Sequence, residues 1–426
     1  MYQAKFTERL SDEQLQAALV AHSARAQRME TLRQYYVGKN PAILGREAIE
    51  GGPDNRVPIT LARRTIKTVT GYMFKPGLIK LVGSGMEKIA QTLRDNREAS
   101  KTSRLGRYMS IYGEALELHY TDAKGKPVFA VPEPAEIMPV YDYSIEPQLV
   151  AAIRVVMIGK AKKVEVWYAD LVDYMDLTDK GLVMVESKEH AYKTVPVSVY
   201  LNNDDRMGDF EAQVPLLDAY DVLISDSLNE LDRFAHAYLI LKGMMMDKVT
   251  AEDVKRKRLF EIVEEAEISF LTKEINDTFL ENLKKTIKDL VHELTQIPDL
   301  TDAKYAAESS GKALRYKLID FENLCSDKEI GFREGLIRRV ELLCTILNFT
   351  DPTLSNDFDV KFSRNFPADV AEVAEWAIKL MPIVSRRTLL DQVPFVKSAD
   401  DELKRLAEEK AADRASLDPY NQDENA

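Results

Sequence analysis

The longest helical pattern in the chain spans residues 312–348, which read KALRYKLIDFENLCSDKEIGFREGLIRRVELLCTILN. This stretch contains no proline, and its apolar side chains keep helical spacing with one skipped turn, which predicts a single long helix. Such a helix would be about 55 Å long if straight. Gly331 and Gly335 lie in its middle, where each costs roughly 1 kcal/mol relative to alanine. We therefore expect a kink or a close helix crossing at these two glycines.

Two further amphipathic helices precede this stretch and bracket an insertion. Apolar residues recur every seven positions in residues 215–241, which predicts a helix of about 40 Å, and a second stripe predicts another helix over 281–296. Between them, residues 242–280 predict a small α/β insertion, with a capped helix from Thr250 and a strand over 266–271. A helical hairpin would place this insertion at its far end, where it can contact other proteins.

The first half of the chain predicts a mixed α+β unit. Ser11 and Gln14 have the spacing of a capping box at the start of a polar helix. Apolar residues recur every three or four positions over 61–72 and 86–99, which indicates two short amphipathic helices. Alternating apolar and polar residues predict strands between residues 115 and 200.

The remaining segments are a loop and a tail. Residues 299–311 are small or polar and predict a loop. The tail predicts a strand over 358–362, a helix over 368–380 and a capped, charged helix from Ser398. Residues 417–426 are rich in Pro, Asn, Asp and Gln, so we expect them to be disordered.

The composition is that of a folded, soluble protein. The 426 residues include 45% hydrophobic and 30% charged side chains, and 58 Lys+Arg against 70 Asp+Glu give a net charge of −12. This acidity argues against a protein that coats nucleic acid, although DNA could slide through an acidic channel. No run of eighteen apolar residues and no signal-peptide pattern is present, so we expect neither a membrane span nor secretion. Cys325 and Cys344 are expected to be reduced core residues.

No motif indicates catalysis, a cofactor or a metal site. Ser310-Gly311-Lys312 resembles the end of a phosphate-binding loop, but Ala306 and Ala313 occupy positions that need Gly and Ser or Thr. The five histidines are scattered, and no serine lies in a G-x-S-x-G motif. We therefore expect no enzymatic activity, no cofactor and no metal. The one dense basic run could be a solvated face or a contact with an acidic partner: Lys255, Arg256, Lys257 and Arg258.

Short motifs that follow one another along the chain point to a family. They include Tyr112-Gly113-Glu114-Ala115, then Gly208-Asp209-Phe210-Glu211, and most specifically Ile297-Pro298-Asp299 followed by Ser310-Gly311-Lys312-Ala313-Leu314. In order and spacing the chain resembles the portal proteins of tailed bacteriophages, specifically the head-to-tail connectors of siphophages, over nearly its whole length. Ser309 departs from the family, which often has Asn there, and the tail after Val396 is short.

The resemblance implies an α+β, predominantly helical portal fold with wing, stem, clip and crown, assembled as a ring around a central channel. The ring usually has twelve subunits and occupies one capsid vertex. The implied parts are a wing (1–213), two stem helices (214–241 and 281–297), a clip (242–280), a tunnel loop (298–311), a long wing helix (312–350), and a crown with the C-terminal tail (351–426).

The resemblance also implies a function and partners. The ring would conduct double-stranded DNA, without sequence specificity, during packaging and ejection. It would dock the large terminase subunit and then the head-completion adaptor and tail proteins, and it would contact the major capsid and scaffolding proteins but no membrane. We expect it in the host cytoplasm during assembly and then at one vertex of the virion. The alternatives are a monomeric scaffolding or minor capsid protein, or a metal-dependent nuclease, although the carboxylate clusters that a nuclease needs are not evident.

Candidate contact residues follow from this assignment. The polar face of residues 281–296 carries Lys285 and Lys288, and it either lines the channel or is an outer solvated face. The basic run at 255–258 is the candidate docking surface of the clip. The candidates for DNA contact in the tunnel loop are Asp302, Lys304, Tyr305, Ser309 and Ser310.

Overall fold

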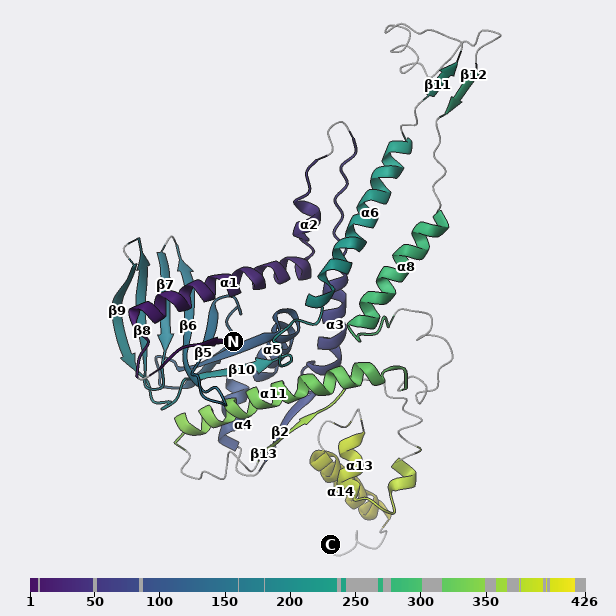
Figure 1. The fold of residues 1–426 in the computed structure, drawn as a ribbon. Coiled ribbons are helices and arrows are strands. Elements are labelled where there is room, and N and C mark those ends of the chain that lie inside the picture. The colour runs from purple at the N-terminus through teal and green to yellow at the C-terminus, as the bar shows by residue number, and fades with distance from the viewer. Residues whose placement is uncertain are drawn as a thin grey trace, which may run out of the picture. The chain divides into compact units, whose positions relative to one another are not determined.

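The structure is a computed structural model of the chain, and Figure 1 shows its elements. The chain divides into two units, Met1–Glu308 with Leu314–Arg364, and Ser309–Ala313 with Asn365–Ala426. None of the described helices is both long and apolar enough to cross a membrane. The structure describes residues 1–6, 8–48, 52–83, 87–159, 161–179, 181–235, 239–242, 267–270, 277–300, 316–348, 358–365, 375, 377–393, 396 and 399–417.

The larger unit contains a six-stranded sheet with the strand order β1-β5-β6-β7-β8-β9. The β1–β5 pair is parallel, and the other pairs are antiparallel. The strands predicted between residues 115 and 200 are confirmed. The strands of this sheet are β1 (Tyr2–Gln3), β5 (Ile137–Tyr141), β6 (Leu149–Ile158), β7 (Ala161–Trp167), β8 (Leu171–Thr178) and β9 (Gly181–Glu189).

Both faces of this sheet are covered. Alternate side chains of a strand point to opposite faces, so Val140 of β5 packs in a core that includes Leu15 of helix α1, while Ile137 packs with Leu116 of β3. Strand β3 is the middle strand of a second, three-stranded sheet with the order β10-β3-β4. The bounds of these elements are α1 (Asp12–Val37), β3 (Glu114–Thr121), β4 (Pro127–Ala130) and β10 (Val197–Leu201).

The N-terminal helices confirm one prediction and correct another. The capping box of α1 is confirmed, because Ser11 accepts from the Gln14 N–H while Gln14 accepts from the Ser11 N–H. The helix expected over 86–99 ends at Asp95, and a helix that the sequence analysis missed follows it. The break is fixed by Arg97, which has φ of 53°, and by Asn96, which accepts from the Phe129 N–H at 3.1 Å. The helices are α2 (Pro41–Leu44), α3 (Leu61–Met73), α4 (Glu87–Asp95) and α5 (Glu98–Tyr112).

Helices α6 and α8 pack side by side, as Figure 1 shows. The helix expected to run to residue 241 ends at Ala235, because residues 239–242 form strand β11 and pair with β12. The expected strand over 266–271 is confirmed as β12, whereas the helix expected from Thr250 lies outside the described residues. The helix expected from residue 281 already begins at Asp277. The bounds are η1 (Glu211–Gln213), α6 (Val214–Ala235), β11 (Leu239–Lys242), β12 (Glu267–Phe270) and α8 (Asp277–Leu294).

The long helix predicted from Lys312 is described as α11 (Ile319–Ile346), a length of about 40 Å. Leu318 precedes it as a non-helical cap residue, and residues 312–315 lie outside the described part. The glycines do permit a close approach, but the neighbour is strand β10 and not the other helix that was expected. A Cβ atom on Gly331 would lie 2.4 Å from the Leu201 carbonyl oxygen, so only glycine permits this approach.

The strand predicted over 358–362 is confirmed as β13 (Phe358–Phe362), but it pairs with β2 (Ile79–Gly83) in the larger unit. Strand β13 therefore belongs to the larger unit, whereas Asn365–Ala426 belong to the second unit together with Ser309–Ala313. That unit contains α13 (Arg386–Gln392), which was not predicted, and α14 (Ala399–Leu417), which confirms the charged helix. Most of the helix expected over 368–380 and residues 418–426 lie outside the described residues.

Candidate functional site

Of the predicted contact residues, the structure describes Lys285 and Lys288, which both lie on α8. Lys285 is exposed and Lys288 is half-buried. The tunnel-loop candidates Asp302, Lys304, Tyr305, Ser309 and Ser310 and the basic run Lys255, Arg256, Lys257 and Arg258 lie outside the described residues. The site is therefore built from α8 and from the contacts that fix the described segments on both sides of residues 301–315.

The C-terminal end of α8 is held to the body of the unit by one carboxylate. Asp299 is about nine-tenths buried and accepts from Lys288 at 2.5 Å and from Arg64 of α3. A carboxylate between two cations forms charge-assisted hydrogen bonds, which are stronger than neutral ones. The ammonium group of Lys288 is thus used within the chain, and Lys285 remains the exposed cation of the pair.

The backbone turn after α8 is similarly fixed. Gln296 adopts a left-handed conformation with φ of 57°, which ends the helix. Thr295 donates its hydroxyl to the Val291 carbonyl at 2.7 Å, and the His292 Nδ1 lies 2.8 Å from the Ile297 carbonyl oxygen. Ile297 is fully buried. The described segment that precedes residue 301 is therefore held in place by these contacts.

Helix α6 is held by a ladder of polar side chains on its inner face. Asp221, Ser225 and Asn229, spaced four residues apart, are all buried. They accept hydrogen bonds from the backbone N–H groups of residues 59, 57 and 55 at 2.9, 3.1 and 2.6 Å. Four helical residues rise about 6.0 Å and two extended residues about 6.6 Å, so the two repeats match closely. The ladder fixes the register of α6 against this segment.

The start of the ladder is reinforced by Asn40. Its amide donates to Asp218 at 2.9 Å and to Asp221 at 2.8 Å, and Tyr35 donates its hydroxyl to Asp218 at 2.9 Å. Burial raises the pKa of Asp221, and the bonds from Asn40 and Ile59 only partly offset this effect. The first turns of α6 are thereby tied to the end of α1.

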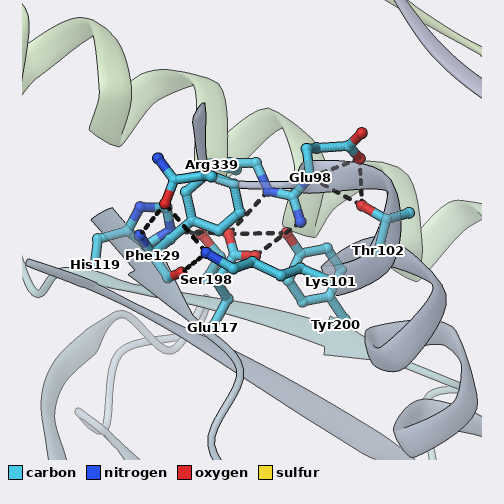
Figure 2. A network of polar contacts seen from close by, with 10 residues as sticks. Glu98, Lys101, Thr102, Glu117, His119, Phe129, Ser198, Tyr200 and Arg339 are labelled. Atoms are coloured by element: carbon cyan, nitrogen blue, oxygen red, sulfur yellow. Dashed lines mark hydrogen bonds and ion pairs between the residues drawn. The ribbon is translucent and has the colours of Figure 1, made fainter. Parts of the chain in front are cut away.

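Helix α11 is joined to the smaller sheet by a buried ion pair (Figure 2). Arg339 donates to both carboxylate oxygens of Glu117 on β3, at 2.8 Å each, and both side chains are fully buried. Arg339 also donates to Thr102 at 3.1 Å and lies 3.3 Å from a carboxylate oxygen of Glu98, both on α5. Burial raises the pKa of Glu117, but Arg339 and His119 outweigh it and lower that pKa to about 2. One guanidinium therefore links α11, β3 and α5.

His119 and Ser198 lie beside this pair, as Figure 2 shows, but they do not form a catalytic relay. The His119 Nε2 atom is 3.2 Å from the Ser198 Oγ and 3.1 Å from a Glu117 oxygen, so one ring nitrogen contacts both groups. A relay needs the serine and the acid on different nitrogens. All three residues are also fully buried. The described residues contain no group of three or more His, Cys, Asp or Glu side chains that could hold a metal ion.

Two further cations attach the N-terminal half of α11. Lys328 is fully buried and contacts Asp209 at 2.6 Å, just before η1 and α6. Arg364 donates to Glu322 at 2.9 Å and also bonds Glu329. The described segment after residue 315 is therefore attached to the larger unit, as is the segment before residue 301.

Cys325 and Cys344 both lie on α11 as free cysteines, Cys325 buried and Cys344 half-buried. Burial raises the pKa of the Cys325 thiol to about 12. Both cysteines were expected to be core residues. Cys325 is one, whereas Cys344 is only half-buried.

Several apolar side chains of α6 and α8 face outward in the single chain. The exposed fraction is 58% for Leu231, 61% for Phe279 and 56% for Leu294. The inner face of α6 is polar, as the ladder shows, so the helix places part of its apolar surface in solvent. Contact with a neighbouring protein surface would remove these side chains from water, which is favourable for apolar groups.

The buried ion pairs and the ladder were missed by the sequence analysis. Glu117 and His119 alternate along a strand and therefore share a face, which was a usable signal. The four-residue spacing of Asp221, Ser225 and Asn229 was another. No sequence signal connects Arg339 with Glu117, because they are 222 positions apart.

Residues 17–415 match the family described as "Phage portal protein, SPP1 Gp6-like". The chain belongs to this family, so its function is that of a phage portal at a capsid vertex and it is a component of the virion. Portal proteins of this family are structural proteins. The resemblance inferred from the sequence motifs is confirmed, as is the α+β portal fold.

Two portal proteins illustrate the similarity. The portal protein of Clostridium phage phiCD119 is 23% identical over 455 residues, which covers 96% of this chain and 98% of that protein. The portal protein of Bacillus phage SPP1 is 23% identical over 226 residues, which covers 50% of this chain and 44% of that protein.

Two particle necks are among the solved structures to which the chain is partly similar. "Neck of empty GTA particle computed with C6 symmetry" has a TM-score of 0.49 and 14% identity and covers 84% of this chain and 91% of that chain. "Neck of native GTA particle computed with C12 symmetry" has a TM-score of 0.47 and 12% identity, with coverage of 86% and 93%.

Proposed function

We propose that the chain assembles in the host cytoplasm into a closed ring, of twelve subunits in the virion, whose central channel conducts double-stranded DNA. The observation that carries the proposal is the family match over residues 17–415. The exposed apolar side chains of α6 and α8 support it, because contacts between neighbouring subunits would bury them. The ring would contact the major capsid and scaffolding proteins at the vertex.

The ring can be tested by sedimentation of the purified chain. Each subunit adds a net charge of −12, so like charges repel in the ring, and salt screens this repulsion over about 8 to 10 Å. We expect rings that form more completely as salt is raised. A monomer at all salt concentrations would contradict the proposal and favour a monomeric scaffolding or minor capsid protein.

Within the ring, we propose that the polar face of α8 and residues 298–311 line the channel. The fixed attachments of residues 295–299 and of α11 support this part, because a segment that contacts moving DNA needs anchored ends. Lys285 is then the described cation available to phosphates, while Lys288 positions Asp299. Contacts to phosphates carry no sequence information, in keeping with a channel that passes every sequence. The alternative is that this face of α8 lies on the outside of the ring.

We also propose that the segment between α6 and α8 docks the large terminase subunit, and later the head-completion adaptor and tail proteins. The chain itself would hydrolyse nothing, and the terminase would supply the packaging force. The support is the antiparallel pairing of β11 with β12, in which Lys242 lies opposite Glu267. This pairing brings the two ends of the intervening segment together, so that the segment is a single insertion between α6 and α8.

The β11–β12 pairing offers a conservative deletion to test docking. Because Lys242 and Glu267 are paired, residues 243–266 can be replaced by Asn-Gly, the preferred two-residue hairpin turn. We expect this variant to form rings and to lose terminase and adaptor in a pull-down. Unimpaired binding of both partners would contradict the docking assignment.

A further inference from the structure

Four arginine side chains line a surface cavity of about 700 Å³ that is formed by residues of α4, α5 and the residue between them, with Pro76. They are Arg94, Arg97, Arg104 and Arg107, here called the arginine cluster, and all four are exposed. None of them belongs to α8 or to residues 298–311. The cluster is therefore separate from the elements assigned to the channel, and an inference drawn from it goes beyond the proposed function.

The cluster has little counter-charge of its own. In the part of the chain that the structure describes, no carboxylate lies within 4.0 Å of these four guanidinium groups. Glu98 is the one acidic residue that lines the cavity, and its carboxylate turns toward Arg339 and Thr102. In a protein with a net charge of −12, these four cations thus have no carboxylate partner among the described residues.

The shape and chemistry of the cluster fit phosphate groups. Guanidinium groups bind phosphate through two parallel hydrogen bonds. Arg104 and Arg107 are neighbours on one face of α5, about 5 to 6 Å apart at their Cβ atoms. The span from Arg97 to Arg107 is about 15 Å, along which one DNA strand presents about four phosphates.

The other lining residues favour DNA over an acidic protein segment. Protein partners bind mainly through buried aromatic and arginine side chains packed in desolvated pockets, yet this cavity has no aromatic lining residue, its apolar lining residues are only Pro76, Leu93 and Ala99, and its arginines are exposed. Ser100 and Ser103 add hydroxyl donors between the arginines. Interfaces with DNA are polar and strongly cationic, as this cavity is.

We propose that the arginine cluster is a second DNA-contact surface of the portal subunit, which binds the phosphate backbone without reading sequence. In this role Arg104 and Arg107 hold phosphates from the face of α5, and Arg94 and Arg97 neutralise the charge at the edge of the cavity.

The test is binding of a short fluorescent duplex DNA of mixed sequence to the assembled full-length protein, measured by anisotropy over a range of salt concentrations. We expect Arg104→Gln with Arg107→Gln to weaken binding and to reduce the slope of log affinity against log salt by about two. Arg104→Lys with Arg107→Lys should keep most of the slope, because both charges remain.

A matched control removes two exposed lysines elsewhere, Lys39→Gln with Lys67→Gln, and should leave the slope unchanged. An unchanged slope in the arginine variant, or an equal reduction in the lysine variant, would overturn the proposal. Tighter binding of a polyglutamate peptide than of the duplex, lost in the arginine variant, would assign the cluster to an acidic protein partner instead. Loss of ring assembly in the arginine variant would assign it to a subunit interface.

Discussion

Arg339 of α11 and Glu117 of β3 form a two-pronged ion pair, with both N–O distances 2.8 Å and both side chains fully buried. The pair joins the long helix to the small sheet at a distance of 222 residues along the chain. The pair thereby fixes the C-terminal half of α11, while Lys328 and Arg364 hold the half that is nearer to the proposed tunnel loop. The predictions below concern this and the other attachments of the helices.

Replacing Arg339 by Met should destabilise the larger unit strongly. The substitution leaves the Glu117 carboxylate buried without its partner, which typically costs about 3 to 5 kcal/mol. The exposed pair of Arg333 and Asp359 is the control, because Arg333→Met should cost less than about 1 kcal/mol. Chemical denaturation measures both, and equal losses would contradict the assigned role of the buried pair.

The surroundings of the pair predict a loss of stability in acid. Burial lowers the pKa of His119, with Glu117 opposing, so the unfolded state takes up a proton first and stability falls as the pH drops below about 6.5. The pKa of Glu117 is lowered to about 2. Its contribution to the free energy of unfolding is therefore fully present above about pH 4.5 and is lost as the pH falls from about 4.5 to about 2.

The histidine part of this prediction can be isolated. Between neutral pH and a pH near 5, the free energy of unfolding should fall less in His119→Gln than in the unchanged protein, because the variant lacks the imidazole that takes up a proton on unfolding. Denaturation curves at the two pH values measure the difference. The same loss in both proteins would show that His119 does not titrate on unfolding.

Gly331→Ala should destabilise α11 although alanine favours helices. The new Cβ would lie 2.4 Å from the Leu201 carbonyl oxygen, a backbone atom, and such overpacking costs about 1 to 3 kcal/mol. Gly71→Ala is the matched control on α3, because nothing lies within 4 Å of its Cβ position. That variant should gain about 0.5 to 1 kcal/mol. In thermal denaturation we expect the melting temperature to fall for Gly331→Ala and to rise for Gly71→Ala. A change in the same direction for both variants would contradict the close approach of α11 to β10.

The ladder on α6 predicts a local change in hydrogen exchange. Ser225→Ala removes the acceptor of the Val57 N–H, at a cost of about 1 to 3 kcal/mol, so the Val57 amide should exchange faster. Ser227→Ala is the control, because Ser227 donates to the Leu223 carbonyl of its own helix. If the Val57 amide exchanged equally fast in both variants, the ladder would not hold the segment.

Local patterns made the regular elements predictable, and tertiary contacts explain the errors. The capping box at Ser11, the strand alternation and the helix over residues 319–346 follow from spacing within a few turns. The apolar period of α6 continues past Ala235, but pairing of β11 with β12 ends the helix there. Asn96 stops α4 through a bond to Phe129, which no local pattern reveals.

The candidate site was predictable only in part. Helical spacing was enough to place Lys285 and Lys288 on the polar face of one helix. It could not show that Lys288 is engaged by Asp299, because that contact depends on the turn at Gln296 and on Arg64 of α3.

The central claim is that α8 and residues 298–311 line the channel of a portal ring. An electron cryomicroscopy reconstruction of the purified, assembled chain tests it most directly. We predict a closed ring in which Lys285 and residues 298–311 face the central channel. A reconstruction in which these residues face the outside of the ring, or a preparation that contains no ring, would contradict the account.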